Sequence, residues 1–217
     1  MKNLFSIFLA IVLFFLIFSN LYAGGQSESK RLPIEGYPNL YKEVDDFDNS
    51  SIIRGRANSE LYFYIGKVLN IGGKATVPNF FFKPTIVITR LSGMVIYVEY
   101  TSPDSWIFLE SIACQNPVTK DLIRLNLEDP KRSLGKEIIG SRTYNIVIEK
   151  ASSVLSAGGV EEFIKLFSDM TNNNLNATFR VYGSDAYREY VMKPNTAKVY
   201  LELFEYFKGL DNKIYDF

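Results

Sequence analysis

Histidine is absent from the 217 residues of this chain, and cysteine occurs once, as Cys114. The missing imidazole excludes Ser-His-Asp and Cys-His catalytic centres, and also zinc sites built on histidine. A single cysteine forms no internal disulfide, so the fold must be stabilised by its hydrophobic core. Cys114 stands in a mostly apolar stretch that is typical of a strand, and we expect it to be a small buried residue.

An excess of charge of either sign is also missing, because 24 Lys and Arg residues balance 24 Asp and Glu residues. A neutral chain lacks the basic surface with which proteins bind nucleic acid or anionic lipid. Within the acidic stretch 43–48, Asp46 and Asp48, followed by Ser50, resemble the first three ligand positions of a calcium loop. However, Ser51 replaces the glycine of such a loop and Ala57 its bidentate glutamate. We therefore expect no metal site, and no motif indicates a cofactor.

Only one long hydrophobic run is present, and it lies at the start of the chain. Lys2 precedes an apolar stretch at 4–18, which is shorter than the roughly 20 residues that a membrane-spanning helix needs. The small residue Ala23 then precedes Gly24, and this order of regions is that of a secretory signal peptide over residues 1–23. We predict export to the periplasm or the medium, with no membrane span after cleavage. The alternative is an uncleaved N-terminal membrane anchor.

The rest of the chain divides into a short linker and one domain. Residues 24–50 are rich in Gly, Ser, Pro and charge and lack periodicity, which predicts a flexible linker or tail. Residues 51–217 are long enough to bury the core of a single globular domain and short for two.

Most of this domain reads as short β-favouring segments bounded by turn residues. Two of them flank Ser92-Gly93 as a hairpin, and a third follows Ser102-Pro103-Asp104, so we expect three consecutive antiparallel neighbours at 85–91, 94–101 and 106–114. The other predicted strands are 60–65, 122–127, 143–149, 177–183 and 188–192, and the 122–127 strand should end at Glu128-Asp129-Pro130.

Two amphipathic helices are predicted late in the chain. Apolar residues at 160, 163, 164 and 167 have the i, i+3, i+4, i+7 spacing of one helical face. A second helix is predicted over 195–208, with Asn195 as its cap and Gly209 as its stop. The fold class is therefore α+β: an antiparallel β-sheet or small β-sandwich with both helices packed on one face or end.

A hydrolase that works without histidine needs a Ser–Lys pair or two carboxylates. Ser133 and Lys136 match a Ser-x-x-Lys spacing, although the companion motifs of serine acyl-enzymes are absent and Ser133 is expected in a loop. Glu99 and Glu110 fall on strands predicted to be neighbours, where a facing carboxylate pair would be the minimal unit of a glycosidase. Both glutamates also suit solvent-facing positions of an alternating sheet.

Aromatic residues are abundant, with 17 Phe and 14 Tyr. Tyr62, Tyr64 and Trp106 form a candidate binding patch, together with Tyr97 and Tyr100, because Tyr and Trp offer rigid amphipathic area to sugars and proteins. Tyr62 and Tyr64 share one face of their predicted strand. The alternative is that these residues only pack the sheet, since aromatics favour strands.

The segment from Ser105-Trp106-Ile107-Phe108 onward, followed later by Phe179-Arg180-Val181-Tyr182-Gly183, a short strand and a closing helix, resembles a layout of small exported bacterial proteins of unknown function. The resemblance covers about residues 90–208. It implies an exported β-rich domain and carries no catalytic residues.

These observations together predict a non-enzymatic binding or interaction domain of the bacterial cell envelope, whose partner is an envelope protein or a glycan. One alternative is a histidine-independent hydrolase of envelope polymers. The other is a sugar- or lipid-binding module that uses the strand aromatics.

Overall fold

The computed structural model describes eleven stretches of the chain, numbered 31–45, 50–56, 60–63, 69–71, 74–76, 79–88, 91–102, 106–139, 142–184, 186–211 and 213. The predicted signal peptide lies outside these residues. Neither of the helices found in these stretches is long and apolar enough to cross a membrane.

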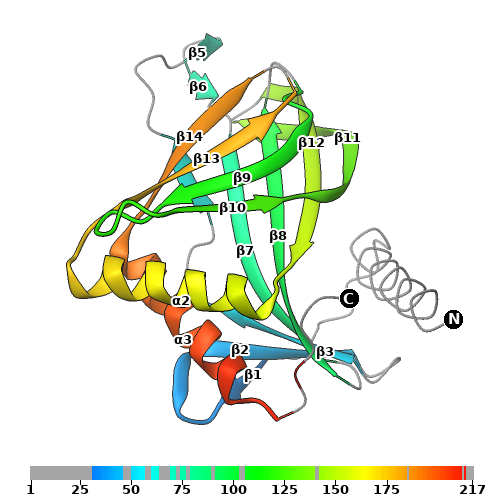
Figure 1. Cartoon of the computed structure of the whole chain (residues 1–217). Helices are drawn as coiled ribbons and strands as arrows, with labels where there is room; N and C mark the ends of the chain where they lie inside the picture. Colours follow the sequence, from blue (N-terminus) through cyan, green and yellow to red (C-terminus); the bar gives the residue numbers. More distant parts are fainter. Residues whose placement is uncertain are drawn as a thin grey trace, which may run out of the picture.

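The described residues form fourteen strands and two helices (Figure 1). In chain order they are β1 (Arg31–Ile34), β2 (Tyr37–Asp45), β3 (Ser50–Gly55), β4 (Glu60–Phe63), β5 (Leu69–Ile71), β6 (Lys74–Thr76), β7 (Asn79–Ile88), β8 (Ser92–Ser102), β9 (Leu109–Gln115), β10 (Leu122–Asn126), β11 (Glu128–Ile139), β12 (Arg142–Val154), α2 (Ala157–Asn172), β13 (Ala177–Gly183), β14 (Tyr187–Met192) and α3 (Pro194–Gly209). The predicted α+β class, with two helices late in the chain, is confirmed.

One large branched sheet carries twelve of these strands, and β5 and β6 form a separate pair. Its strands follow the order β1-β2-β3-β7-β4-β14-β13-β9-β10, and β7 also pairs with β8, which leads through β12 to β11. Every pairing between these strands is antiparallel. The sheet curves so that β9, β10 and β13 cross in front of β7, β8 and β12 (Figure 1).

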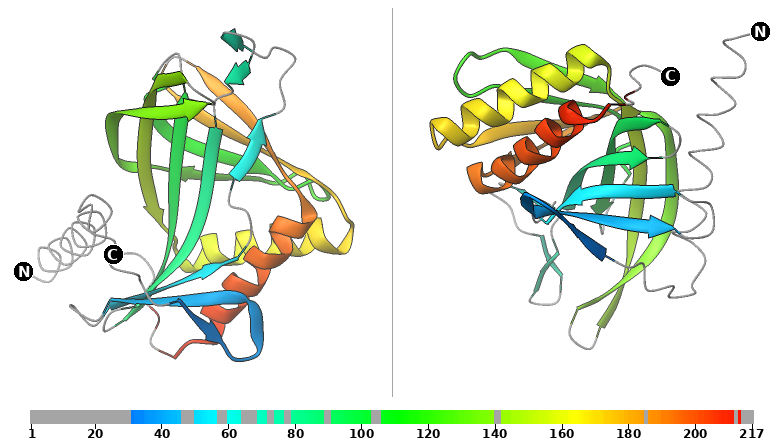
Figure 2. Two further views of the ribbon diagram at one scale, coloured as in Figure 1. Left: turned by 180° about the vertical axis from the view of Figure 1, so that it is seen from behind. Right: turned by 90° about the horizontal axis from the view of Figure 1, so that it is seen from below.

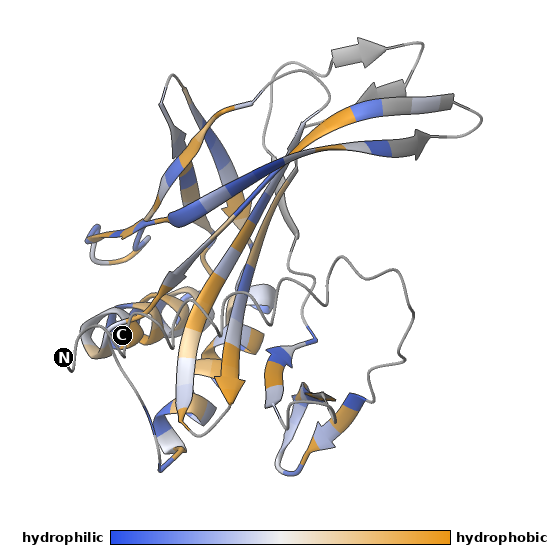
Figure 3. Cartoon of the chain, turned by 90° about the vertical axis from the view of Figure 1, so that its right-hand side faces the viewer, coloured by the Kyte–Doolittle hydropathy of each residue, from blue (hydrophilic) through white to orange (hydrophobic). Residues whose placement is uncertain are grey.

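The helices close one end of this curved sheet, where α2 and α3 lie side by side (Figure 2). The aromatic rings of Phe82, Phe163, Phe167, Tyr200 and Phe204 pack there with centroids 5.4 to 5.9 Å apart. The Tyr200 hydroxyl also donates a hydrogen bond of 2.8 Å to the Phe82 carbonyl. The apolar stretches of the long strands gather where they pass these helices (Figure 3), so the main core lies at this end.

A buried carboxylate joins the start of β9 to β12. Glu149 of β12 is 0% exposed and accepts hydrogen bonds from the backbone N–H groups of Ile107 (2.6 Å), Phe108 (3.1 Å) and Leu109 (2.9 Å). The Arg132 guanidinium of β11 lies 3.5 Å from the same carboxylate. A buried carboxylate is tolerated only when it is hydrogen-bonded or paired, and both conditions hold here.

Helix α2 confirms the predicted periodicity, since Val160, Phe163 and Phe167 are buried on its inner face. Its cap is Ser156, whose hydroxyl accepts from the Gly159 N–H at 3.1 Å. The cap predicted for the last helix is wrong. Pro194 is the first helical residue of α3, and Lys193 precedes it with no side-chain cap, so Asn195 lies inside the first turn. Proline is well suited to that first position because its missing N–H would have no helical partner.

Part of the predicted linker is folded. Within 24–50, the described residues 31–45 form the hairpin β1–β2, which turns at Gly36 with φ 77° and pairs with β3. Leu40 is fully buried, and Glu43 forms ion pairs with Arg31 and Arg54 on the flanking strands. The polar composition of this segment predicted a flexible linker, because composition does not reveal the partners that its residues find on neighbouring strands.

The predicted three-strand meander is also wrong in its last step. β7 and β8 do pair, with Ile88 opposite Ser92, so their turn precedes Ser92. β9, however, pairs with β10 and β13, whereas the second neighbour of β8 is β12. Phe108 has φ 58°, a left-handed backbone conformation that redirects the chain just before β9 begins. The strand predicted at 122–127 does end before Glu128-Asp129-Pro130, because β10 stops at Asn126. These three residues then begin strand β11, which accommodates them with a register shift.

Candidate functional site

The outer face of β10, β9, β13 and β14 carries a distinctive group of exposed and half-buried side chains. The register places Arg124, Ala113, Arg180 and Glu189 in one cross-strand row. The adjacent row is Asn126, Ser111, Tyr182 and Tyr187. Residues directly opposite one another in antiparallel strands project from the same face, so these two rows form one surface. We call Arg124, Arg180, Tyr182, Tyr187 and Glu189 the arginine–tyrosine face.

Stacked guanidinium groups and phenol rings hold this face together. The Cζ atom of Arg124 lies 4.9 Å from the ring centroid of Tyr182, and that of Arg180 lies 4.5 Å from Tyr187 and 6.0 Å from Tyr182. The two tyrosine rings are 6.1 Å apart. A cation within about 6 Å of an aromatic face is attracted to the ring, so the side chains restrain one another.

Small residues on β9 allow these long side chains to meet. Arg124 and Tyr182 belong to β10 and β13, which lie on either side of β9 and are therefore about 10 Å apart. Their side chains meet above Ala113 and Ser111, which are only 3% and 7% exposed although they face outward. The arginine–tyrosine face therefore covers the middle of β9.

The two arginines differ in their charge partners. The Nε atom of Arg180 donates to Glu189 at 2.9 Å, and Nη2 donates to the same oxygen. This hydrogen bond to Glu189, followed by that to Tyr182, raises the pKa of the Arg180 guanidinium. Arg124 is exposed, and no carboxylate among the described residues pairs with it. The face thus presents one positive charge that the described part of the chain leaves uncompensated.

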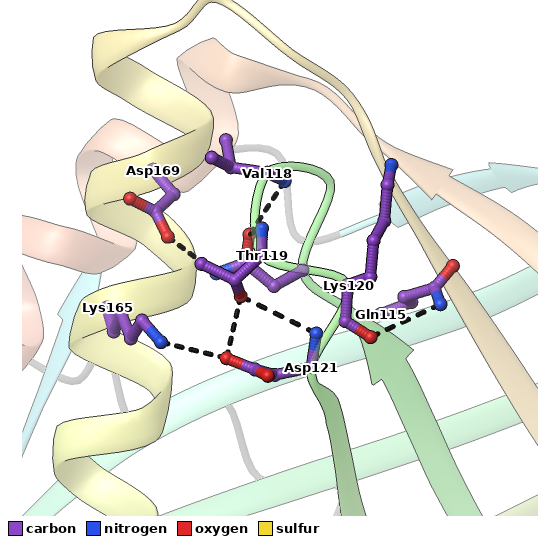
Figure 4. A network of polar contacts seen from close by, with 8 residues as sticks. Gln115, Val118, Thr119, Lys120, Asp121, Lys165 and Asp169 are labelled. Atoms are coloured by element: carbon purple, nitrogen blue, oxygen red, sulfur yellow. Dashed lines mark hydrogen bonds and ion pairs between the residues drawn. The ribbon is translucent and has the colours of Figure 1, made fainter.

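The turn that leads into β10 is fixed to helix α2 (Figure 4). The buried Asn116 side chain accepts the backbone N–H of Thr119 at 3.2 Å and donates to Asp169 of α2 at 2.7 Å. Lys165 of α2 donates to Asp121 at 2.8 Å, and this hydrogen bond, followed by that from the Thr119 hydroxyl, lowers the pKa of the Asp121 carboxyl. The strand that carries Arg124 is therefore anchored just before its first residue, Leu122.

Polar groups surround the face and suit a hydrogen-bonding ligand. Gln115 and Thr178 are exposed and lie in the cross-strand row of Leu122, on one side of Arg124. Asn126 is exposed in the row on the other side of Arg124. Tyr187 is 53% exposed and Leu122 is 62% exposed, so ring and aliphatic surface is also accessible. These groups can bind and orient a ligand. The carboxylate within the face, Glu189, is already engaged by Arg180.

The predicted aromatic patch is not brought together by the register. Tyr62 lies on β4 opposite Val191 of β14, at the level of Gln115 along β9. Trp106 precedes the opposite end of β9, about 20 Å further along the strand. Tyr64 and the side chain of Tyr62 lie outside the described residues, so a contribution of these two side chains to binding stays a prediction.

The other two predicted aromatics are parts of the sheet packing. Tyr100 is fully buried inside the curved sheet, as the packing alternative predicts. Tyr97 is partly buried, and burial raises its pKa to about 12. Trp106 is likewise partly buried, next to the bonds that Ile107 makes with Glu149.

The residue pairs considered for a hydrolase do not meet. Ser133 lies on strand β11 and not in a loop, and Lys136 is three residues further, so the two side chains leave opposite faces. Glu99 forms ion pairs with Lys83 (3.7 Å) and Lys150 (3.2 Å). Glu110 belongs to β9, which does not pair with the strand that carries Glu99.

Two further predictions concern metal and thiol chemistry. Within the stretches that the structure describes, no group of three acidic or cysteine side chains could hold a metal ion. Residues 46–48, half of the acidic segment 43–48, lie outside those stretches. Cys114 is buried, as predicted, and burial raises the pKa of its thiol.

The residues of the arginine–tyrosine face escaped the sequence-based prediction. Alternation in 122–127 does place Arg124 on the polar side of its strand, and Arg180 and Tyr182 alternate in the same way within 177–183. Alternation therefore predicts which side chains point outward, but it does not predict that the two segments pair with the same strand, β9. No family model, curated protein or solved structure matches the chain, so its function must be argued from this geometry.

Proposed function

We propose that this protein is an exported, non-enzymatic binding domain of the bacterial cell envelope, and that it binds its partner through the arginine–tyrosine face. The observation that carries the proposal is the exposed guanidinium of Arg124, which stacks on Tyr182 at 4.9 Å and pairs with no carboxylate among the described residues. Export rests on the signal-like residues 1–23, whose cleavage predicts a mature N-terminus at Gly24.

A stacked arginine is well suited to recognition. Its ring contact limits the rotamers that the side chain loses on binding, and the outer edge of the planar guanidinium stays available for two parallel hydrogen bonds. Arginine and tyrosine are also enriched among the residues that dominate binding energy at interfaces. The neighbouring ion pair Arg180–Glu189 restrains the arginine–tyrosine face without adding net charge to it.

The hydrolase alternative has less support. Its two candidate pairs, Ser133 with Lys136 and Glu99 with Glu110, lie on opposite faces or on strands that do not pair. General acid–base and nucleophilic catalysis require such groups within hydrogen-bond reach of each other or of one substrate atom. Binding therefore explains the exposed side chains better than catalysis does.

Co-sedimentation with envelope fractions of the producing bacterium tests the proposal. We expect the purified mature protein to sediment with one fraction, and a double variant, Arg124→Ala with Tyr187→Ala, to lose at least tenfold in apparent affinity. Lys198→Ala, at an exposed position of α3, is the matched control and should bind as the unaltered protein does. Equal binding by the double variant, with an unchanged circular dichroism spectrum, would show that this face is not the binding surface.

A further inference from the structure

We infer that the ligand of the arginine–tyrosine face is a carboxylate-bearing glycan, in which the carboxylate of an acidic sugar binds Arg124 and the sugar rings lie against Tyr187. This inference rests on the proposed function, because it names the ligand class of the same surface. Three features of the face lead to it: the position of the free charge, the number of free charges and the chemistry of the groups around them.

The position of the free charge selects a carboxylate. The Cζ atom of Arg124 lies over the Tyr182 ring, 4.9 Å from its centroid, so the ring restrains a guanidinium whose planar fork carries parallel N–H donors. A carboxylate accepts two such bonds at once, and the resulting bidentate pair is stronger and more directional than a single charged contact. Lysine could not reproduce this geometry, because its ammonium group is a point charge.

The number of free charges selects a sparsely charged ligand. Of the two arginines in the face, Arg180 is neutralised by Glu189, which leaves Arg124 alone. Nucleic acids and anionic membranes need many cations in a row, and the chain as a whole has no excess of positive charge. A glycan with a single carboxylate on each acidic sugar matches one free guanidinium.

The surrounding chemistry selects a sugar over an acidic peptide. Gln115, whose Nε2 also donates to the Lys120 carbonyl at 3.3 Å, lies with Thr178 and Asn126 around Arg124. Their amide and hydroxyl groups both donate and accept, as sugar hydroxyls require. Tyr187, with 53% of its surface exposed, offers a ring on which the apolar face of a pyranose can lie. An acidic peptide would instead be matched by additional cations, and the face has none to spare.

Calorimetric titration with defined oligosaccharides tests the inference. The probes are trigalacturonic acid, its fully methyl-esterified form, monomeric galacturonic acid and a pentaglutamate peptide. We expect trigalacturonic acid to bind, the ester to bind at least tenfold more weakly, and added salt to weaken only the binding of the acid. Binding of the trimer well above that of the monomer would indicate a polymer chain as the ligand, and equal binding would indicate a free acidic sugar.

Variants at Arg124 separate charge from geometry. Arg124→Gln should lower the affinity for trigalacturonic acid at least tenfold, and Arg124→Lys should restore only part of it. Arg56→Gln, which removes an exposed arginine outside the face, is the matched control and should change nothing. Tyr187→Ala should weaken the ester and the acid alike, because the ring contacts the sugar and not its charge.

Several outcomes would overturn the inference. They are equal affinity for acid and ester, no binding of either acid, an unchanged affinity in Arg124→Gln, or tighter binding of pentaglutamate than of trigalacturonic acid. The proposed function survives each of these if envelope binding still depends on the face. It fails only if the double variant Arg124→Ala with Tyr187→Ala still sediments with the envelope fraction.

Discussion

The carboxylate of Glu149 should be the most sensitive single polar group of the fold. It is 0% exposed and accepts three backbone N–H groups, from Ile107, Phe108 and Leu109, at 2.6, 3.1 and 2.9 Å. Replacing Glu149 with alanine leaves all three donors without this acceptor. Replacing it with glutamine keeps one oxygen but turns the other into an amide N–H group, which faces a donor instead of accepting from it.

The loss of free energy of unfolding depends on how many of these N–H donors are shielded from water. A hydrogen bond to a charged acceptor contributes about 1.5–3 kcal/mol, so three of them set an upper limit near 9 kcal/mol. Phe108 is exposed, and water can reach its N–H, whereas Ile107 and Leu109 are buried. We therefore expect Glu149→Ala to lower the free energy of unfolding by about 3–5 kcal/mol and Glu149→Gln by about 2 kcal/mol. A domain of this size has only about 5–15 kcal/mol in total, so the glutamine variant is the safer one to measure.

Urea denaturation followed by tryptophan fluorescence is the suitable assay. Trp106 is the sole tryptophan and directly precedes the first N–H that Glu149 binds, so its emission reports on the same contact. Glu110→Gln is the matched control, because Glu110 is exposed and its removal should change the free energy of unfolding by less than about 0.5 kcal/mol. If Glu149→Gln destabilises no more than this control, the carboxylate does not hold β9 against β12.

Three further predictions concern a helix cap, a thiol and a phenol. Ser156→Ala should lower the free energy of unfolding by about 1 kcal/mol in urea melts, whereas Asn195→Ala should cost less than about 0.5 kcal/mol, because Ser156 caps the start of α2 and Asn195 does not cap α3. Cys114 should react with a thiol reagent only at the rate of unfolding, and rapid labelling of the native protein would contradict its burial. Burial raises the pKa of Tyr97 to about 12, against about 10 when unfolded, so its stabilising contribution should be complete below pH 10 and lost as the pH rises to about 12. An ultraviolet titration compared with Tyr97→Phe measures this, and ionisation near pH 10 would refute it.

Local patterns predicted the helices and the late hairpin because those elements depend on neighbouring residues. The spacing of Val160, Phe163 and Phe167 identifies the buried face of α2 without knowledge of what covers it. Residues 177–183 and 188–192 pair with each other as β13 and β14 across a short turn. In these elements the interacting residues lie close together along the chain, so a local sequence pattern reveals both partners of each interaction.

The branched sheet could not be predicted in this way. Strand β7 pairs with β3, β4 and β8, and the second neighbour of β8 is β12, about fifty residues further along the chain. Alternation shows which side of a strand is buried but not which strand lies next to it. For the same reason Glu149 looked like an ordinary polar residue, since only the folded chain brings residues 107–109 to its carboxylate.

The middle of β9 departs from what a strand normally favours, and this departure is the local sign of the candidate site. Ala113 and Ser111 face outward at positions where β-branched or aromatic residues would stabilise a sheet by up to about 1 kcal/mol each. A large residue at either position would hold Arg124 and Tyr182 apart and prevent their 4.9 Å contact. Natural sequences keep such locally unfavourable choices where function requires them. The small residues therefore fit a strand whose outer surface is made by its neighbours, with the Arg124 and Tyr182 side chains meeting above β9.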